Sequence, residues 1–242
     1  MFLALARARP AFGCNNHKAE GNNMAEYFYV LYTILYIILL VYGVFVYRQT
    51  RRLTSILIML NAIGLLWENG VIASGRFIGE GSLLQVLNMG RYCLHYALVP
   101  PLAWAMLEQV RLAGHAWAGT KLARGLTIAA VLGLMVFGFG ASAPGLFPRL
   151  APETLDGVLR YTAPNLASTP IAIFVMSVAL AAGLVLWLKN KWPWLFLAAL
   201  LAFAVKGGLS NFELLDLVAG NGAEVLFQVA LLQTELFVMR KP

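Results

Sequence analysis

The sequence predicts an all-α, polytopic membrane protein, a bundle of seven transmembrane helices with the N-terminus outside and the C-terminus in the cytoplasm. Of the 242 residues, 60% are hydrophobic and only 12% are charged, whereas a soluble domain is about 45–50% apolar and about 25% charged. The apolar residues form long runs, and basic residues collect in alternate loops between those runs. These observations exclude a soluble globular domain, a disordered chain and a protein that binds nucleic acid.

Seven apolar stretches are long enough to cross the hydrocarbon core of a bilayer, which needs about 20 residues of helix. They span residues 27–47, 54–75, 83–110, 122–142, 169–188, 193–215 and 219–239. The first contains a ladder of tyrosines from Tyr29 to Tyr36, which is typical of helix packing. The third contains Pro100 and Pro101, and we expect a kink just before them, because proline removes a backbone donor and clashes with the preceding turn. Residues 27–242 then form a single transmembrane domain.

Basic residues predict the orientation of this domain, because cytoplasmic loops carry more lysine and arginine than the opposite side. One side collects the loops after the first, third and fifth stretches, together with the C-terminus. Its basic residues are Arg48, Arg51, Arg52, Arg111, Lys121, Arg124, Lys189, Lys191, Arg240 and Lys241. The other side carries fewer, and half of those lie in the N-terminal tail. We expect a multi-pass protein of the cell (cytoplasmic) membrane, with an organelle membrane as the less favoured alternative.

Two segments outside the spans allow several interpretations. Residues 1–26 are polar and basic, and they fit a short exposed tail, an organelle-type presequence, or extra residues upstream of a true start at Met24. The outer loop, 143–168, carries the sequence Pro-Glu-Thr at 152–154, which can start a helix. We expect a short helix that runs to about Tyr161 and lies flat on the membrane surface, and a solvated linker is the alternative.

Charged and amide side chains lie inside the apolar stretches, where each charge costs about 2.5–3.5 kcal/mol on insertion scales. Within a stretch most of them are three, four or seven residues apart, so they share one face of its helix. Four helices therefore present a polar face to the interior, mainly in the outer half of the bundle. The predicted ligand-binding residues are Glu68, Asn69, Asn88, Arg91, His95, Lys206, Asn211, Glu224 and Gln228.

Three functions fit this polar cluster. The first is binding or transport of a small polar or lipid-like ligand, in which Arg91 and Lys206 hold an anionic group. Glu68 or Glu224 would then hold a cationic group or a proton. The second is a structural or assembly subunit of a membrane complex, in which the cluster pins the helices together. The third is an intramembrane enzyme that modifies a lipid or isoprenoid, with His95 as the acid or base and Glu68 or Glu224 as its catalytic partner.

The remaining polar side chains indicate no metal site. His95 is the one histidine inside a predicted span, and zinc prefers several histidine or cysteine ligands, so no metal is expected. The sequence does not identify a cofactor. Glu108, Arg111 and Glu235 lie near the cytoplasmic ends of their spans, and we expect them to be interfacial residues that form salt bridges or snorkel. The expected partners are membrane lipids, a lipid or small amphiphilic ligand, and subunits of a membrane complex, without nucleic acid.

Overall fold

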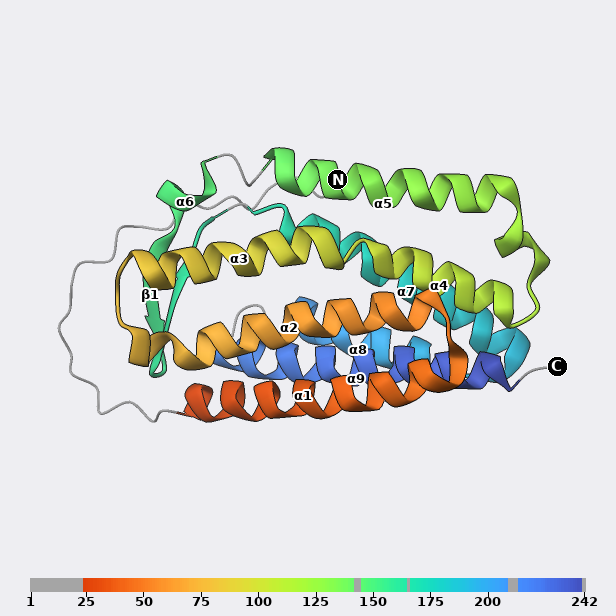
Figure 1. Ribbon diagram of the computed structural model, residues 1–242, viewed down its shortest axis with the longest axis horizontal. Coiled ribbons are helices and arrows are strands. Elements are labelled where there is room, and N and C mark those ends of the chain that lie inside the picture. Colours follow the sequence, from red (N-terminus) through yellow and green to blue (C-terminus); the bar gives the residue numbers. More distant parts are fainter. Residues whose placement is uncertain (1–23, 142–144, 165, 209–212, 241–242) are drawn as a thin grey trace.

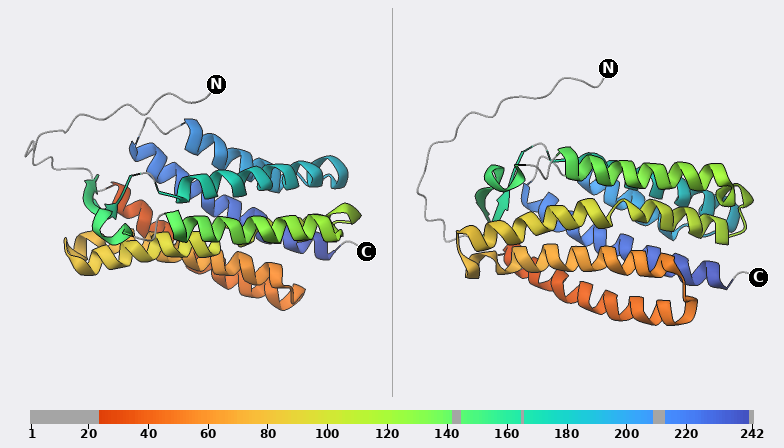
Figure 2. Two further views of the ribbon diagram at one scale, coloured as in Figure 1. Left: turned by 90° about the horizontal axis from the view of Figure 1, so that it is seen from above. Right: turned by 45° about the horizontal axis from the view of Figure 1, so that its top comes forward.

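The computed structural model describes residues 24–141, 145–164, 166–208 and 213–240, and most of these belong to helices that run side by side (Figure 1). The longer helices are α1 (Met24–Thr50), α2 (Leu53–Ile78), α3 (Ser82–Leu98), α4 (Pro101–Leu112), α5 (Lys121–Ala141), α7 (Ser168–Asn190), α8 (Trp194–Gly208) and α9 (Glu213–Met239). The shorter elements are η1 (Ala116–Gly119), α6 (Leu146–Arg149), β1 (Ala151–Leu155) and β2 (Val158–Thr162). The two strands and α6 gather at one end of the bundle, and the last turn of α9 lies at the other (Figure 2).

Five of these helices are long and apolar enough to cross a membrane. They are α1, α2, α5, α7 and the part of α9 from Val218 to Met239. The expected number of seven such helices is therefore not what the structure shows. The stretch 83–110 is divided into α3 and α4, each shorter than a membrane span, and α8 contributes the shorter apolar helix Trp194–Val205.

The division between α3 and α4 occurs at the two prolines. Val99 N donates to His95 O at 3.2 Å, but beyond this point Leu102 N donates to Val99 O at 3.1 Å, a step of three residues rather than four. Pro100 and Pro101 have no N–H group, so the regular four-residue bonds are lost there. The backbone of Pro100 keeps helical angles, with φ −56° and ψ −39°, and α4 continues the path of α3 (Figure 1). The helix is therefore interrupted where the kink was predicted, and the bend itself stays a prediction.

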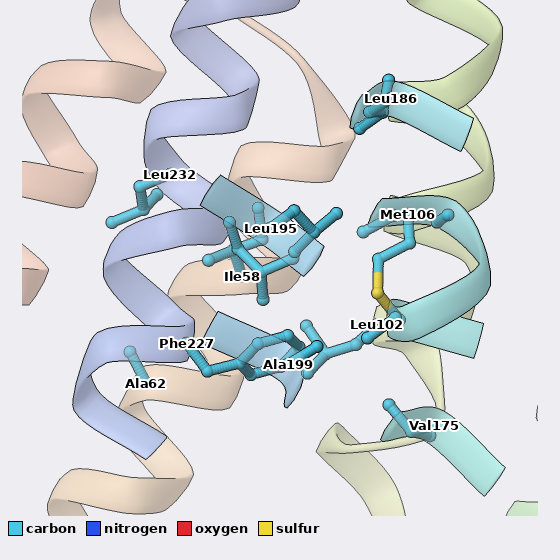
Figure 3. Close-up of a cluster of buried hydrophobic side chains, with 14 of the residues drawn as sticks. Ile58, Ala62, Leu102, Met106, Val175, Leu186, Leu195, Ala199, Phe227 and Leu232 are labelled. Atoms are coloured by element: carbon cyan, nitrogen blue, oxygen red, sulfur yellow. The ribbon is translucent and has the colours of Figure 1, made fainter. Parts of the chain in front are cut away.

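The main apolar core lies where α1, α2, α4, α7, α8 and α9 meet. Figure 3 shows Ile58 of α2, Met106 of α4 and Leu195 of α8 among its side chains. Helix α5 lies at the edge of the bundle, and Gly138 is the one buried residue along its length. The rest of its apolar surface is exposed, which is typical of a helix that faces lipid.

The outer loop forms a β-hairpin rather than the expected helix over 152–161. Strands β1 and β2 pair in antiparallel register, with Leu155 opposite Val158. The turn residues Asp156 and Gly157 both have positive φ, 47° and 82°, as a two-residue type I′ turn requires. The prediction of a helix was wrong because an Asp-Gly pair between two short strands is a stronger local signal than a helix start.

The hairpin packs on the ends of α1, α2 and α3. Ala25 N donates to Asp156 Oδ2 at 2.9 Å, and Gly81 N donates to Tyr161 Oη at 3.1 Å. On α2, a Cβ atom at Gly75 would overlap the carbonyl oxygen of Leu159. Glycine at this position therefore allows the backbone of β2 to lie directly against the helix.

Candidate functional site

An ion pair between Arg91 and Glu68 joins α3 to α2. Arg91 Nη2 lies 2.9 Å from Glu68 Oε1, and Arg91 Nη1 donates to Asn88 Oδ1 at 2.6 Å. The side chain of Arg91 is 6% exposed, and that of Glu68 is 28% exposed. The guanidinium also lies over the ring of Tyr92, 5.5 Å from its centroid. The structure thus confirms that buried salt bridges occur in this bundle, and it brings three of the predicted residues together.

The two asparagines of the cluster turn their amide groups back onto their own helices. Asn88 Nδ2 donates to Leu84 O and Asn69 Nδ2 donates to Leu65 O, each at 2.8 Å. This arrangement leaves the amide oxygens for other partners. Asn88 Oδ1 accepts from Arg91, whereas Asn69 Oδ1 is buried and has no hydrogen-bond partner among the described residues.

Other buried polar atoms near this ion pair also have no hydrogen-bond partner in the part of the chain that the structure describes. They are the hydroxyl oxygens of Tyr29 and Tyr36 and the Nε of Arg91. Both tyrosines interact electrostatically with Glu68 and with Glu224 of α9. Because most buried polar groups are satisfied in folded proteins, these atoms can accept from or donate to water or a polar ligand.

The two tyrosines were not among the predicted site residues. Their spacing is typical of helix packing, and both are indeed fully buried against neighbouring helices. The feature that could have identified them is the face on which they lie. Tyr29 and Tyr36 are seven residues apart on α1, as Asn61 and Glu68 are on α2, and a seven-residue spacing repeats one helix face.

The structure places the remaining predicted residues at different depths. His95 lies one turn further along α3 than Arg91, with its ring edge-on to Tyr96 at 6.4 Å. Gln228 is buried on α9, one turn beyond Glu224. Lys206 belongs to α8, but its side chain lies outside the described residues, as does Asn211 entirely. The participation of Lys206 and Asn211 in the polar cluster therefore stays a prediction.

A cavity of about 590 Å³ lies beside the cluster, between α3, α5 and the start of α7. Phe137 and Pro170 are among its apolar lining residues, and Ser168 and Thr169 supply hydroxyl groups. Tyr92 also lines it, and the same ring lies under the guanidinium of Arg91. Neither Arg91 nor Glu68 belongs to the lining, so Tyr92 connects the cavity to the charged pair.

A second buried polar cluster lies at the opposite end of the bundle, around Glu235 of α9. Its carboxylate accepts from Thr54 Oγ1 at 2.5 Å and from Gln109 Nε2 at 3.1 Å, and Arg52 Nη1 lies 3.8 Å away. Glu235 thus forms the expected salt bridge, with Arg52, but its side chain is fully buried and does not snorkel as was expected. The reason is that α2 and α4 both contribute polar partners at this level.

Glu108 of α4 forms the salt bridge that was expected of it. Arg111 Nε lies 2.6 Å from Glu108 Oε2, and a second arginine, Arg124 of α5, lies 3.4 Å from Glu108 Oε1. The side chains of both arginines are nearly half exposed. The expected salt bridge is therefore present, and the position of these residues at the membrane interface stays a prediction.

The arrangement around Arg91 can hold an ion pair in a largely apolar environment. Its remaining polar atoms can form hydrogen bonds to water or to a polar ligand.

Comparison with known proteins adds no assignment to this geometry. No protein-family model matches the chain, and no curated protein matches it at a significant level.

Proposed function

We propose that this protein is a multi-pass membrane protein that binds a lipid-like ligand in the outer half of its bundle. The observation that carries the proposal is the cavity of about 590 Å³ beside the buried Arg91–Glu68 pair. Its volume lies within the range of about 300–1,000 Å³ that is usual for small-molecule sites. Transport of the same ligand across the membrane is an extension of this proposal.

The lining of the cavity favours an amphiphile over a fully polar solute. Phe137 and Leu166 offer an apolar surface to an acyl or isoprenoid chain, and Ser168 and Thr169 can donate to a headgroup oxygen. Behind Tyr92 lies the guanidinium of Arg91, which is paired with the carboxylate of Glu68. A zwitterionic headgroup, which carries both signs of charge, fits beside such an ion pair.

Two features support seven membrane crossings with the N-terminus outside. Helices α3 and α4 follow one path across the bundle (Figure 1), so together they reach as far as a single span. The two ends also differ in charge. At the hairpin end Arg76, Arg149 and Arg160 lie together with Glu26, Glu80, Glu153 and Asp156. The opposite end carries nearly all the other described arginines and lysines, and cytoplasmic faces are enriched in such residues.

The test is to fill the cavity and measure the bound ligand. Ala141 lines the cavity at the end of α5, and Ala129 is an exposed alanine on the same helix. We expect lipidomics and native mass spectrometry to find a co-purifying lipid with the wild type and with Ala129→Trp, but not with Ala141→Trp. If Ala141→Trp retains the same lipid, the cavity is not its binding site.

A role as a structural or assembly subunit is the second candidate. It is favoured by the direct contact between Arg91 and Glu68 and by the exposed apolar surface of α5, which a partner helix could cover. In that case substitution of the ion pair would release a partner subunit without changing the bound lipid. The role of His95 as an acid or base, with Glu68 or Glu224, stays a prediction.

A further inference from the structure

A second cavity, of about 510 Å³, lies at the basic end of the bundle. It is formed where α4 ends, η1 follows and α5 begins. Its lining residues are Arg111, Gly114, Ala116, Gly119, Thr120 and Arg124. It is separate from the site proposed above, which lies at the outer end.

The charge around this cavity is positive. Arg111 and Arg124 share one acidic partner, Glu108, and Lys121 at the start of α5 is exposed nearby. Arg111 uses its Nε for this carboxylate, and Arg124 uses one Nη. Because a guanidinium carries five N–H donors, both arginines have donors left for an anion.

The two arginines are held in place by their surroundings. The guanidinium of Arg124 lies over the ring of Trp104, 5.1 Å from its centroid. The stem of Arg111 runs close to Gly119, where an added Cβ would lie 3.1 Å from Arg111 Cδ. Trp117 of η1 is 53% exposed, and tryptophan is enriched at the level of lipid headgroups. The cavity therefore combines oriented arginines with an aromatic residue typical of the membrane interface.

We infer that this cavity binds the phosphate group of an anionic phospholipid from the adjoining leaflet. Arginine matches phosphate in geometry and can form two parallel hydrogen bonds to it. Basic pockets between helices on the cytoplasmic side are suited to anionic headgroups. The inference requires that the protein is embedded in a membrane, but it does not depend on the outer ligand site.

The experiment titrates lipid onto the full-length protein in neutral detergent and counts bound molecules by native mass spectrometry. The probes are phosphatidylglycerol, phosphatidylcholine and inorganic phosphate. Arg111→Gln/Arg124→Gln removes the proposed contacts, and Lys189→Gln/Lys191→Gln removes the same net charge from exposed positions outside the cavity. We expect the first variant to bind phosphatidylglycerol at least about tenfold more weakly than the second, since hydrogen bonds to charged groups are worth about 1.5 kcal/mol or more.

Two further variants separate loss of binding from loss of folding. Ala116→Glu places a carboxylate in the cavity at an exposed position and leaves both partners of Glu108 intact, so it too should weaken phosphatidylglycerol binding. Adding Glu108→Gln to the double arginine variant avoids a stranded carboxylate and should give a folded protein that still binds weakly. Equal losses in the arginine and lysine variants would overturn the inference. Equal binding of phosphatidylcholine would do so as well, and binding of inorganic phosphate without lipid would assign the cavity to a free phosphate-bearing solute.

Discussion

Substitution of Gly75 by alanine should release the hairpin from the bundle. The new Cβ would overlap the carbonyl oxygen of Leu159 and lie 3.1 Å from its carbonyl carbon. These are backbone atoms, so β2 has to move as a unit. Overpacking typically costs about 1–3 kcal/mol, and exposure of Val158 and Leu159, both buried now, would add about 1.5–3 kcal/mol for each side chain that is fully exposed. If one of the two side chains becomes exposed, the two terms together come to about 2.5–6 kcal/mol, and the higher helix propensity of alanine offsets about 1 kcal/mol of this. We therefore expect Gly75→Ala to lower the free energy of unfolding by about 1.5–5 kcal/mol.

Gly70→Ala is the matched control, because Gly70 lies on the same helix and a Cβ there meets no atom within 4 Å. Alanine is about 0.8–1.0 kcal/mol better than glycine inside a helix, so this variant should be as stable as the wild type or more so. The measurements are thermal unfolding in detergent and the rate of limited proteolysis at Asp156–Gly157. If both variants unfold at the same temperature and the hairpin stays protected in both, the close approach of β2 to α2 is wrong.

Three further substitutions test the contacts between helices, each measured by thermal or denaturant-induced unfolding. Arg91→Ala should lower the free energy of unfolding by about 2–4 kcal/mol, because it leaves the Glu68 carboxylate without its cation. The double variant Arg91→Ala/Glu68→Ala should recover part of that loss. Glu235→Ala should lower the free energy of unfolding by about 2–4 kcal/mol, since it removes a buried carboxylate that accepts from several donors. An unchanged free energy of unfolding would contradict the burial of Glu235. Gly183→Ala should lower the free energy of unfolding by about 1–3 kcal/mol, because the new Cβ would lie 2.5 Å from Phe196 N, where α7 packs against α8.

Spacing along the helices was enough to place Glu68 and Arg91 in one polar cluster, but it did not identify them as a pair. Asn88 and Arg91 are three residues apart on α3, and the antiparallel packing of α2 on α3 brings Glu68 to their level. A short loop between two helices enforces that arrangement, so the contact follows from local information. The break at Pro100 is predictable for the same reason, because it depends on the proline ring and the preceding turn.

Contacts between helices that are distant in the sequence could not be predicted in this way. The burial of the Glu235 side chain depends on Thr54 and Gln109. These two residues lie on helices that the sequence does not show to be neighbours of α9. The position of Tyr29 beside the Arg91–Glu68 pair likewise depends on how α1 is rotated against α2 and α3. The hairpin is a different case, because Asp156 and Gly157 carry a local signal that favours a turn.

Glu235 and Glu68 illustrate how a structural contact differs from a binding site. Glu235 has no exposed surface, and donors from two other helices occupy both of its oxygens, so it can serve mainly to hold α2, α4 and α9 together. Glu68 also pairs with an arginine, but its side chain is 28% exposed. The buried hydroxyl groups of Tyr29 and Tyr36, which have no hydrogen-bond partner among the described residues, interact electrostatically with it. An ion pair that only holds helices together is not stabilised by unsatisfied polar atoms nearby, because each such buried atom lowers the stability of the folded state. Their presence around Glu68 is better explained by a ligand or water that completes the site.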